Sequence, residues 1–114
     1  MWTYTAYILN KFGEKNNYGE LSVDDLSVFV FDNLWRKQKL SFYDNREDLV
    51  LDLKYLDKLK VIDLELEKRI RLREKKLKKI SRIVEDSALL TGVTLFDEYR
   101  RRIDKAFECL QQKQ

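Results

Sequence analysis

The sequence contains no histidine and no proline, and its 114 residues include one cysteine and three glycines. Without histidine, a Ser-His-Asp triad, a Cys-His dyad and the usual zinc sites cannot be assembled from this chain. The lone Cys109 cannot form an internal disulfide, which fits a reducing compartment. A chain with so few helix-breaking residues is expected to consist of a few long elements. We therefore expect a binding protein rather than an enzyme, with no cofactor and no metal.

Long hydrophobic runs are also missing, since no uninterrupted apolar run exceeds four residues. A membrane-spanning helix needs about 20 predominantly apolar residues. The first residues do not place a basic segment before an apolar stretch, as a signal peptide does. These features predict a cytoplasmic protein without a membrane partner. The high lysine and glutamate content resembles that of proteins from thermophiles.

The positive charge is concentrated in one segment. The whole chain has 23 basic and 20 acidic side chains, a net charge of +3. Residues 1–67 have a net charge of −4, residues 68–82 a net charge of +8, and residues 83–114 a net charge of −1. A cluster of this kind can bind a polyanion although the total charge is small, because phosphates respond to charges within about 8–10 Å.

Apolar spacing predicts two helices in the first third of the chain. The first spans residues 3–14, with Gly13 at its end, and a polar turn follows it. Ser22 is placed to cap the second helix, which carries apolar side chains over residues 23–35 and is expected to be packed on more than one side. Residues 28–31 could alternatively form a strand.

A third helix is predicted over residues 45–60, with Asp44 as its N-cap. Its expected buried positions are Leu49, Leu53, Leu56 and Leu59. The apolar period then changes to two, which predicts a hairpin with a turn at residues 67–69. With Leu66 opposite Ile70, the hairpin would place Glu65 opposite Arg71 and Asp63 opposite Arg73, and each pair would contribute about 0.2–1 kcal/mol.

The helical period returns at Glu74, and a last helix is expected after Thr94, which is placed to cap it. Gly92 interrupts the two helices, unless one helix continues through it at a cost of about 1 kcal/mol. The last helix carries apolar residues at alternating spacings of three and four, which is a seam of two heptads. Because two heptads are too short to be stable alone, this seam must pack on something.

The order helix, helix, helix, hairpin, helix resembles that of a winged helix-turn-helix domain. The stretch from Asp48 to Ile80 is similar to the recognition helix, wing and next helix of small, mostly archaeal regulators of the PadR and MarR families. The matching elements are Leu53 with Leu56, Val61 with Ile62, and residues 69–72 followed by the lysines of residues 75–79. Two departures are a wing turn without Gly or Asn and an unusually hydrophobic second helix.

The resemblance implies a mainly α protein with a small β-hairpin, divided into a winged-helix domain over residues 1–82 and a C-terminal helical extension over residues 83–114. It also implies a transcription regulator of an archaeon or an archaeal virus, which binds double-stranded DNA as a homodimer. The third helix would lie in the major groove and the wing beside the DNA backbone. The C-terminal helices would form the dimer interface, through Phe96, Tyr99, Ile103, Phe107 and Leu110.

The candidate DNA-binding residues lie in three segments: Arg46, Lys54, Tyr55 and Lys58 in the third helix, Lys68, Arg69 and Arg71 in the wing, and Lys75, Lys76 and Lys79 after it. Each segment has a purely structural alternative. Half of the exposed side chains of the third helix are acidic, so this helix could serve only the core. The wing arginines Arg71 and Arg73 could be ion-paired across the hairpin, whereas Lys68 and Arg69 at its tip have no such partner. The lysines after Glu74 could serve solubility alone, and the whole domain could instead be a protein-interaction module.

Overall fold

The computed structural model describes residues 2–91 and 94–112, with side chains described for residues 2–86 and 98–110. This part of the chain is mainly helical and contains a small antiparallel sheet. In chain order the elements are α1 (Trp2–Asn16), β1 (Glu20–Ser22), α2 (Val23–Val28), the π-helix η1 (Phe29–Lys37), α3 (Arg46–Lys58), β2 (Ile62–Glu65), β3 (Arg69–Leu72), α4 (Glu74–Thr91) and α5 (Thr94–Gln112).

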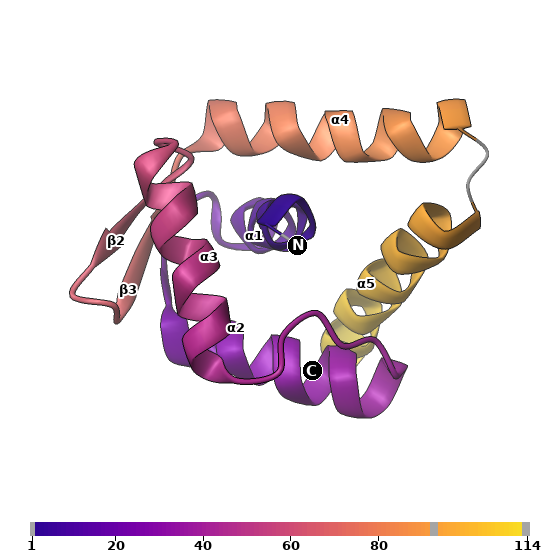
Figure 1. Cartoon of the computed structure of the whole chain (residues 1–114), viewed down its shortest axis with the longest axis horizontal. Helices are drawn as coiled ribbons and strands as arrows, with labels where there is room; N and C mark the ends of the chain where they lie inside the picture. The colour runs from indigo at the N-terminus through magenta and orange to yellow at the C-terminus, as the bar shows by residue number, and fades with distance from the viewer. Residues whose placement is uncertain (1, 92–93, 113–114) are drawn as a thin grey trace.

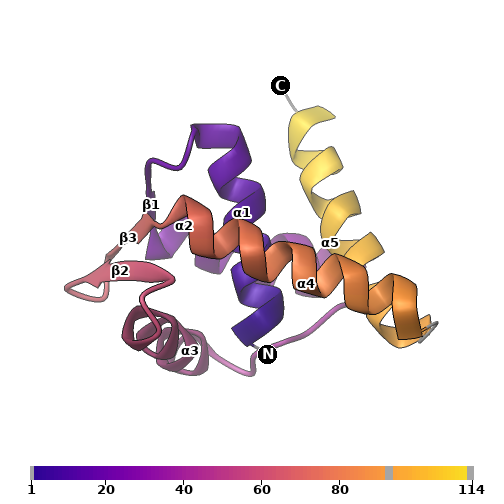
Figure 2. The same ribbon diagram turned by 90° about the horizontal axis from the view of Figure 1, so that it is seen from above.

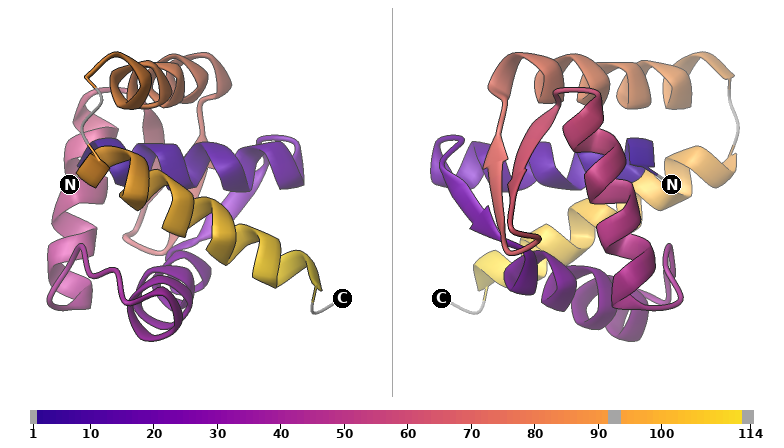
Figure 3. Two further views of the ribbon diagram at one scale, coloured as in Figure 1. Left: turned by 90° about the vertical axis from the view of Figure 1, so that its right-hand side faces the viewer. Right: turned by 60° about the vertical axis from the view of Figure 1, so that its left-hand side comes forward.

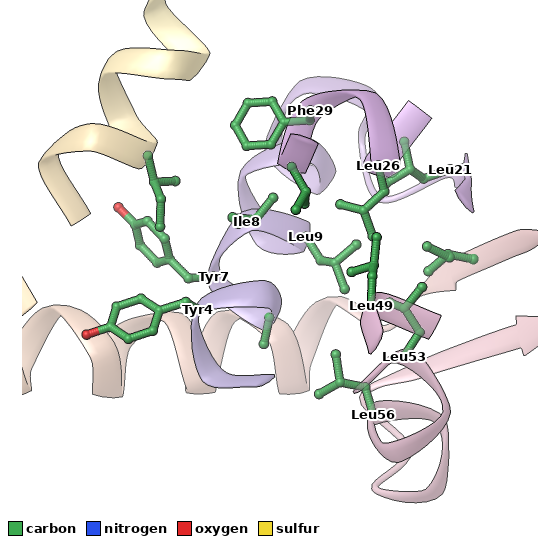
Figure 4. Close-up of a cluster of buried hydrophobic side chains, with 14 of the residues drawn as sticks. Tyr4, Tyr7, Ile8, Leu9, Leu21, Leu26, Phe29, Leu49, Leu53 and Leu56 are labelled. Atoms are coloured by element: carbon green, nitrogen blue, oxygen red, sulfur yellow. The ribbon is translucent and has the colours of Figure 1, made fainter. Parts of the chain in front are cut away.

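Helix α1 lies at the centre of the fold. Figure 1 shows α4, α3, the α2–η1 helix and α5 around it, and Figure 2 shows α4 crossing over it. Every residue from Tyr4 to Asn10 is buried, which requires neighbours on all sides of the helix. The three predicted leucines Leu49, Leu53 and Leu56 of α3 are fully buried and face Leu9 and Leu26 (Figure 4). Full burial of each such side chain contributes about 1.5–3 kcal/mol.

The first helix is longer than predicted, because Gly13 does not end it. The helix continues to Asn16, and the chain reverses only at Asn17 and Tyr18, which have φ angles of 57° and 58°. The Tyr18 ring folds back over Gly13, and its hydroxyl donates a hydrogen bond to Asn10 Oδ1 at 2.8 Å. The glycine therefore serves close ring packing rather than helix termination.

Gly13→Ala is expected to destabilise the protein by about 1–3 kcal/mol, the usual cost of overpacking. An added Cβ would lie 2.5 Å from Tyr18 Cδ1 and Cε1, although alanine favours the helix by about 1 kcal/mol over glycine. Urea unfolding would measure the change, with Gly13→Ala/Tyr18→Ala as the matched variant that removes the clash. If Gly13→Ala alone is more stable than the parent, the ring packing described here is wrong.

The predicted cap at Ser22 is confirmed, since its Oγ accepts a hydrogen bond from the backbone N–H of Asp25 at 3.0 Å. The alternative strand over residues 28–31 is wrong, because these residues are helical. Nine residues of this helix adopt π geometry, which the apolar spacing did not predict. The predicted burial holds for Phe29 and Leu34, but Trp35 is 48% exposed.

Helix α3 begins one residue later than predicted. Asn45, rather than Asp44, is its N-cap and accepts a hydrogen bond from the backbone N–H of Asp48 at 2.9 Å. The helix ends at Lys58, and Leu59 is 37% exposed rather than buried, because it lies beyond the last turn.

The sheet contains one strand that the sequence did not indicate. Its order is β1-β3-β2, so the predicted hairpin β2–β3 is joined by the three-residue strand β1 (Figure 3). The predicted register is wrong by two residues: Leu64 lies opposite Ile70, and Asp63 lies opposite Arg71. The turn comes earlier than predicted, because Leu66 and Glu67 both adopt positive φ angles and the backbone N–H of Lys68 donates to the carbonyl of Glu65. A two-residue turn with this geometry shifts the pairing of the whole hairpin.

Helix α5 packs on the core of its own chain. Ile103, Ala106 and Phe107 are buried, and the Phe107 ring lies 4.4 Å from that of Phe29. The Tyr7 hydroxyl donates a hydrogen bond to Asp104 at 2.6 Å, and burial together with this carboxylate raises the pKa of Tyr7.

The residues expected to form the dimer seam therefore pack within one chain. Tyr99 contacts Tyr4 and Phe42, and Leu110 packs on the same core. Phe96 lies outside the described side chains. A homodimer stays a prediction, and it would need another surface or an exchange of α5 between chains. Within the described residues, no helix is both long enough and apolar enough to cross a membrane.

Candidate nucleic-acid interface

The wing arginines are engaged in ion pairs. Arg71 lies 3.6 Å from both Glu20 and Glu65, and Arg73 makes a two-bond contact with Asp63 at 2.7 and 3.1 Å. The guanidinium of Arg73 lowers the pKa of Asp63, so this carboxylate stays charged to a lower pH than a free aspartate. The acids predicted to pair with these arginines do so, but as diagonal neighbours and not as directly opposite residues.

Arg69 also has a partner, contrary to the expectation that the tip is free. Glu20 lies 3.7 Å from it and belongs to β1, the strand that was not predicted. Of the two tip residues, Lys68 makes no side-chain hydrogen bond or ion pair among the described residues, and it is exposed. The wing thus carries little uncompensated positive charge.

Two of the four candidates on α3 are likewise paired. Arg46 contacts Asp24 at 2.6 Å, and Lys54 contacts Glu67 of the wing turn at 2.7 Å. Exposed pairs of this kind contribute about 0–1 kcal/mol, so a phosphate can compete for the cation. However, the released carboxylate would then lie close to the phosphate and repel it. These cations are therefore poor phosphate ligands in their present setting.

A groove lies between α3 and the wing turn. It has a volume of about 490 Å³ and is open to solvent. Its exposed apolar residues include Leu51 on α3, which is 61% exposed, and Leu66 on the wing, which is 89% exposed. We call this depression the wing groove; it is lined by Arg46, Glu47, Val50, Leu51, Lys54, Leu66, Glu67 and Lys68.

A cluster of cations without an ion-pair partner among the described residues lies where the end of α3 meets the start of α4. We call this region the basic corner and define it by Lys58, Lys60, Lys75, Lys79 and Arg82. All five side chains are exposed, and none has a hydrogen bond or ion pair to another described residue. The two helices are held together there by Lys76, whose ammonium donates to the carbonyl of Leu59 at 2.9 Å. Figure 1 shows this junction at the opposite end of the hairpin from its turn.

The spacing on α4 places three of these cations on one side of the helix. Lys75, Lys79 and Arg82 stand at positions i, i+4 and i+7, opposite the buried Leu77 and Ser81. At 1.5 Å per residue they span roughly 10 Å, about one Debye length, so they act together on a polyanion. Glu74, the acidic residue nearest to them in the chain, is paired with Lys78 at 2.9 Å on another side of α4.

The candidate residues are thus divided by the fold. Of these residues, Lys58, Lys75 and Lys79 belong to the basic corner, Lys76 bonds to the carbonyl of Leu59 beside it, and Arg46, Lys54 and Lys68 line the wing groove. Lys60 was missed because it stands at the end of the predicted third helix, whereas the structure ends α3 at Lys58 and brings the next residues beside Arg73, just before α4. Neither Glu20 nor Asp24 was expected to neutralise a cation, because both belong to distant parts of the chain.

The described residues contain no cluster of three or more His, Cys, Asp or Glu side chains that could hold a metal ion. Comparisons with protein-family models, with curated proteins and with solved structures found no match to this chain.

The wing turn offers a test of the hairpin geometry. Leu66 has a φ of 51° and is 89% exposed, so its side chain makes little packing contact while its backbone is strained. A left-handed conformation costs about 1–2 kcal/mol for most residues and less for asparagine. Leu66→Asn is therefore expected to raise the free energy of unfolding by about 0.5–1 kcal/mol, as measured by urea unfolding. Leu66→Ala, which keeps the strain, should change it little; equal gains in both variants would contradict the turn.

Proposed function

We propose that this chain is a DNA-binding protein of the winged helix-turn-helix type, which binds duplex DNA through the phosphate backbone. Two features support the fold assignment. The chain order α1, α2–η1, α3, β2–β3, α4 is the order that the resemblance requires, and α3 runs beside the hairpin (Figure 3). One feature departs from it, since residues 38–45 form a longer connection before α3 than the three- or four-residue turn of a helix-turn-helix.

The observation that carries the proposal is the basic corner. Its five cations are exposed and make no hydrogen bond or ion pair among the described residues, whereas Arg46, Lys54 and Arg73 are ion-paired with carboxylates. Asp63, the carboxylate that interacts with Lys60, already makes a two-bond contact with Arg73, so it leaves most of the positive charge of the basic corner unmatched. A polyanion provides the missing negative charge, and release of its counterions supplies the free energy of binding.

In this proposal the contacts with phosphate position the protein, and any reading of sequence falls to α3. The outward side of α3 carries Glu47, Leu51, Tyr55 and Lys58. Of these, Lys58 is suited to an acceptor on a guanine edge, and Leu51 to a thymine methyl group. The mixture of an acid and apolar side chains favours weak sequence preference over a defined operator.

Direct binding tests the proposal. The fluorescence anisotropy of a labelled short duplex of random sequence should rise when the chain is added at low salt. The expected Kd lies in or below the range of about 10⁻⁴–10⁻⁶ M that is typical of non-specific binding. Low salt gives phosphate contacts their greatest strength. If no duplex binds under these conditions, the proposed function is wrong.

The wing groove favours a second candidate function, a protein-interaction module. Its cations Arg46 and Lys54 are neutralised by Asp24 and Glu67, and exposed leucines lie on both of its walls. Duplex binding distinguishes the two functions. The proposed function predicts that the parent binds a duplex at low salt and that Leu51→Asp weakens this binding, because the new carboxylate on the outward side of α3 repels phosphate. The interaction module predicts instead that no duplex binds to the parent.

A further inference from the structure

Two aromatic side chains lie beside the basic corner and have no role in the contacts proposed so far. Trp2, at the start of α1, and Tyr55, on α3, have ring centroids 5.6 Å apart with planes inclined at 59°. Tyr55 is 44% exposed, and Trp2 is partly exposed. They come from opposite ends of the first half of the chain, and the fold brings them together.

Trp2 also forms one wall of a second open depression, with a volume of about 240 Å³. The other walls are Leu59 and Val61 after α3, and Lys76, Lys79 and Ile80 on α4. This volume lies below the range of about 300–1,000 Å³ that holds a drug-sized ligand, so it suits a single ring system. The floor is apolar, and the charges at its rim are positive.

These properties define the chemistry of an occupant. A flat apolar group is needed to cover the indole and the aliphatic floor, and a negative charge is needed beside Lys79 at the rim. Lys58 stands about one turn after Tyr55 on α3 and, like Lys79, has no partner of its own among the described residues. A nucleotide combines both groups in one unit. Base stacking on an aromatic side chain contributes about 1–3 kcal/mol per base and tolerates any base.

The base that enters must be unpaired. Inside a duplex the faces of the bases are stacked on one another, and only their edges are accessible in the grooves. We propose that the chain binds single-stranded nucleic acid at this depression, with one base against Trp2 and Tyr55 and the adjoining phosphates at Lys58 and Lys79. This inference rests on the proposed function for its phosphate contacts, and it adds a preference for unpaired bases.

The two tryptophans of the chain make the proposal directly measurable, because they occupy different sites. Trp35→Phe leaves Trp2 as the reporter at the depression, and Trp2→Phe leaves Trp35 on η1. Each variant is titrated at low salt with an oligothymidylate, with a duplex of equal phosphate number, and with inorganic polyphosphate. The oligothymidylate should quench the Trp2 reporter more strongly than either of the other two polyanions, while the Trp35 reporter stays nearly unchanged.

Variants of Tyr55 separate stacking from charge. Tyr55→Ala should weaken oligothymidylate binding about tenfold, and by a clearly larger factor than it weakens duplex binding, whereas Tyr55→Phe should retain the parent affinity for the oligothymidylate. Because this side chain is substantially exposed, both variants are expected to fold, which circular dichroism verifies.

The outcomes distinguish this inference from the proposed function. Duplex binding with a silent Trp2 reporter, or equal quenching by all three polyanions, would overturn the inference and leave the proposed function in place. Absence of binding to every polyanion would overturn both.

Discussion

Replacing Lys75, Lys79 and Arg82 together with glutamine is expected to weaken duplex binding by about a hundredfold at about 0.1 M salt. The three side chains stand on the outward side of α4 and have no ion partner among the described residues, so each substitution removes a cation that nothing else compensates. Loss of three phosphate contacts should also reduce the slope of log K against log salt by roughly 2.7. Anisotropy titrations of parent and variant at several salt concentrations measure both effects.

A variant with the same change in net charge provides the control. Arg36, Lys37 and Lys105 are three exposed cations on η1 and α5. Their replacement with glutamine should lower duplex affinity by no more than about threefold, because they lie outside the basic corner and η1 carries its own acid, Asp32, close to two of them. Equal losses in the two triple variants would show that total charge, and not this junction, governs binding.

Phe107→Ala is expected to lower the free energy of unfolding by about 3–5 kcal/mol. The ring is 4% exposed and lies within 4.9 Å of the Phe12 ring and 4.4 Å of the Phe29 ring, so its removal leaves a cavity between α5, α1 and η1. Urea unfolding of parent and variant measures the loss. Glu108→Ala, at the exposed neighbouring position, should change the stability by less than about 0.5 kcal/mol.

The same experiment decides whether α5 packs within one chain. An intramolecular α5 makes the unfolding midpoint of the parent independent of protein concentration, whereas an interface between chains makes it rise with concentration. A rising midpoint, or a Phe107→Ala variant as stable as the parent, would contradict the packing of α5 described here.

Helices and buried leucines could be predicted from the sequence because local rules determine them. The 3.6-residue apolar period places Leu49, Leu53 and Leu56 on one side of α3, and Ser22 caps α2 through a contact three residues away. The strand β1 has only three residues and lies between a turn and a helix cap, so no period can reveal it.

Errors in the candidate site have a different origin. The hairpin register depends on the turn, and Leu66 and Glu67 form a turn that usually requires asparagine and glycine. The partners of Arg46 and Arg69 lie far away in the chain, at Asp24 and Glu20, and depend on the tertiary fold. Charge density along the sequence therefore located the basic segment but not its uncompensated part.

The salt dependence of duplex binding by the parent chain tests the central claim most directly. If each of the five cations at the basic corner binds one phosphate, the slope of log K against log salt is about −4.5, at roughly −0.9 per phosphate contact. A slope near zero would show that phosphate contacts do not drive binding. A slope steeper than about −8 would show that the ion-paired arginines of the wing also bind phosphate, and either result would contradict the assignment of the interface to the basic corner.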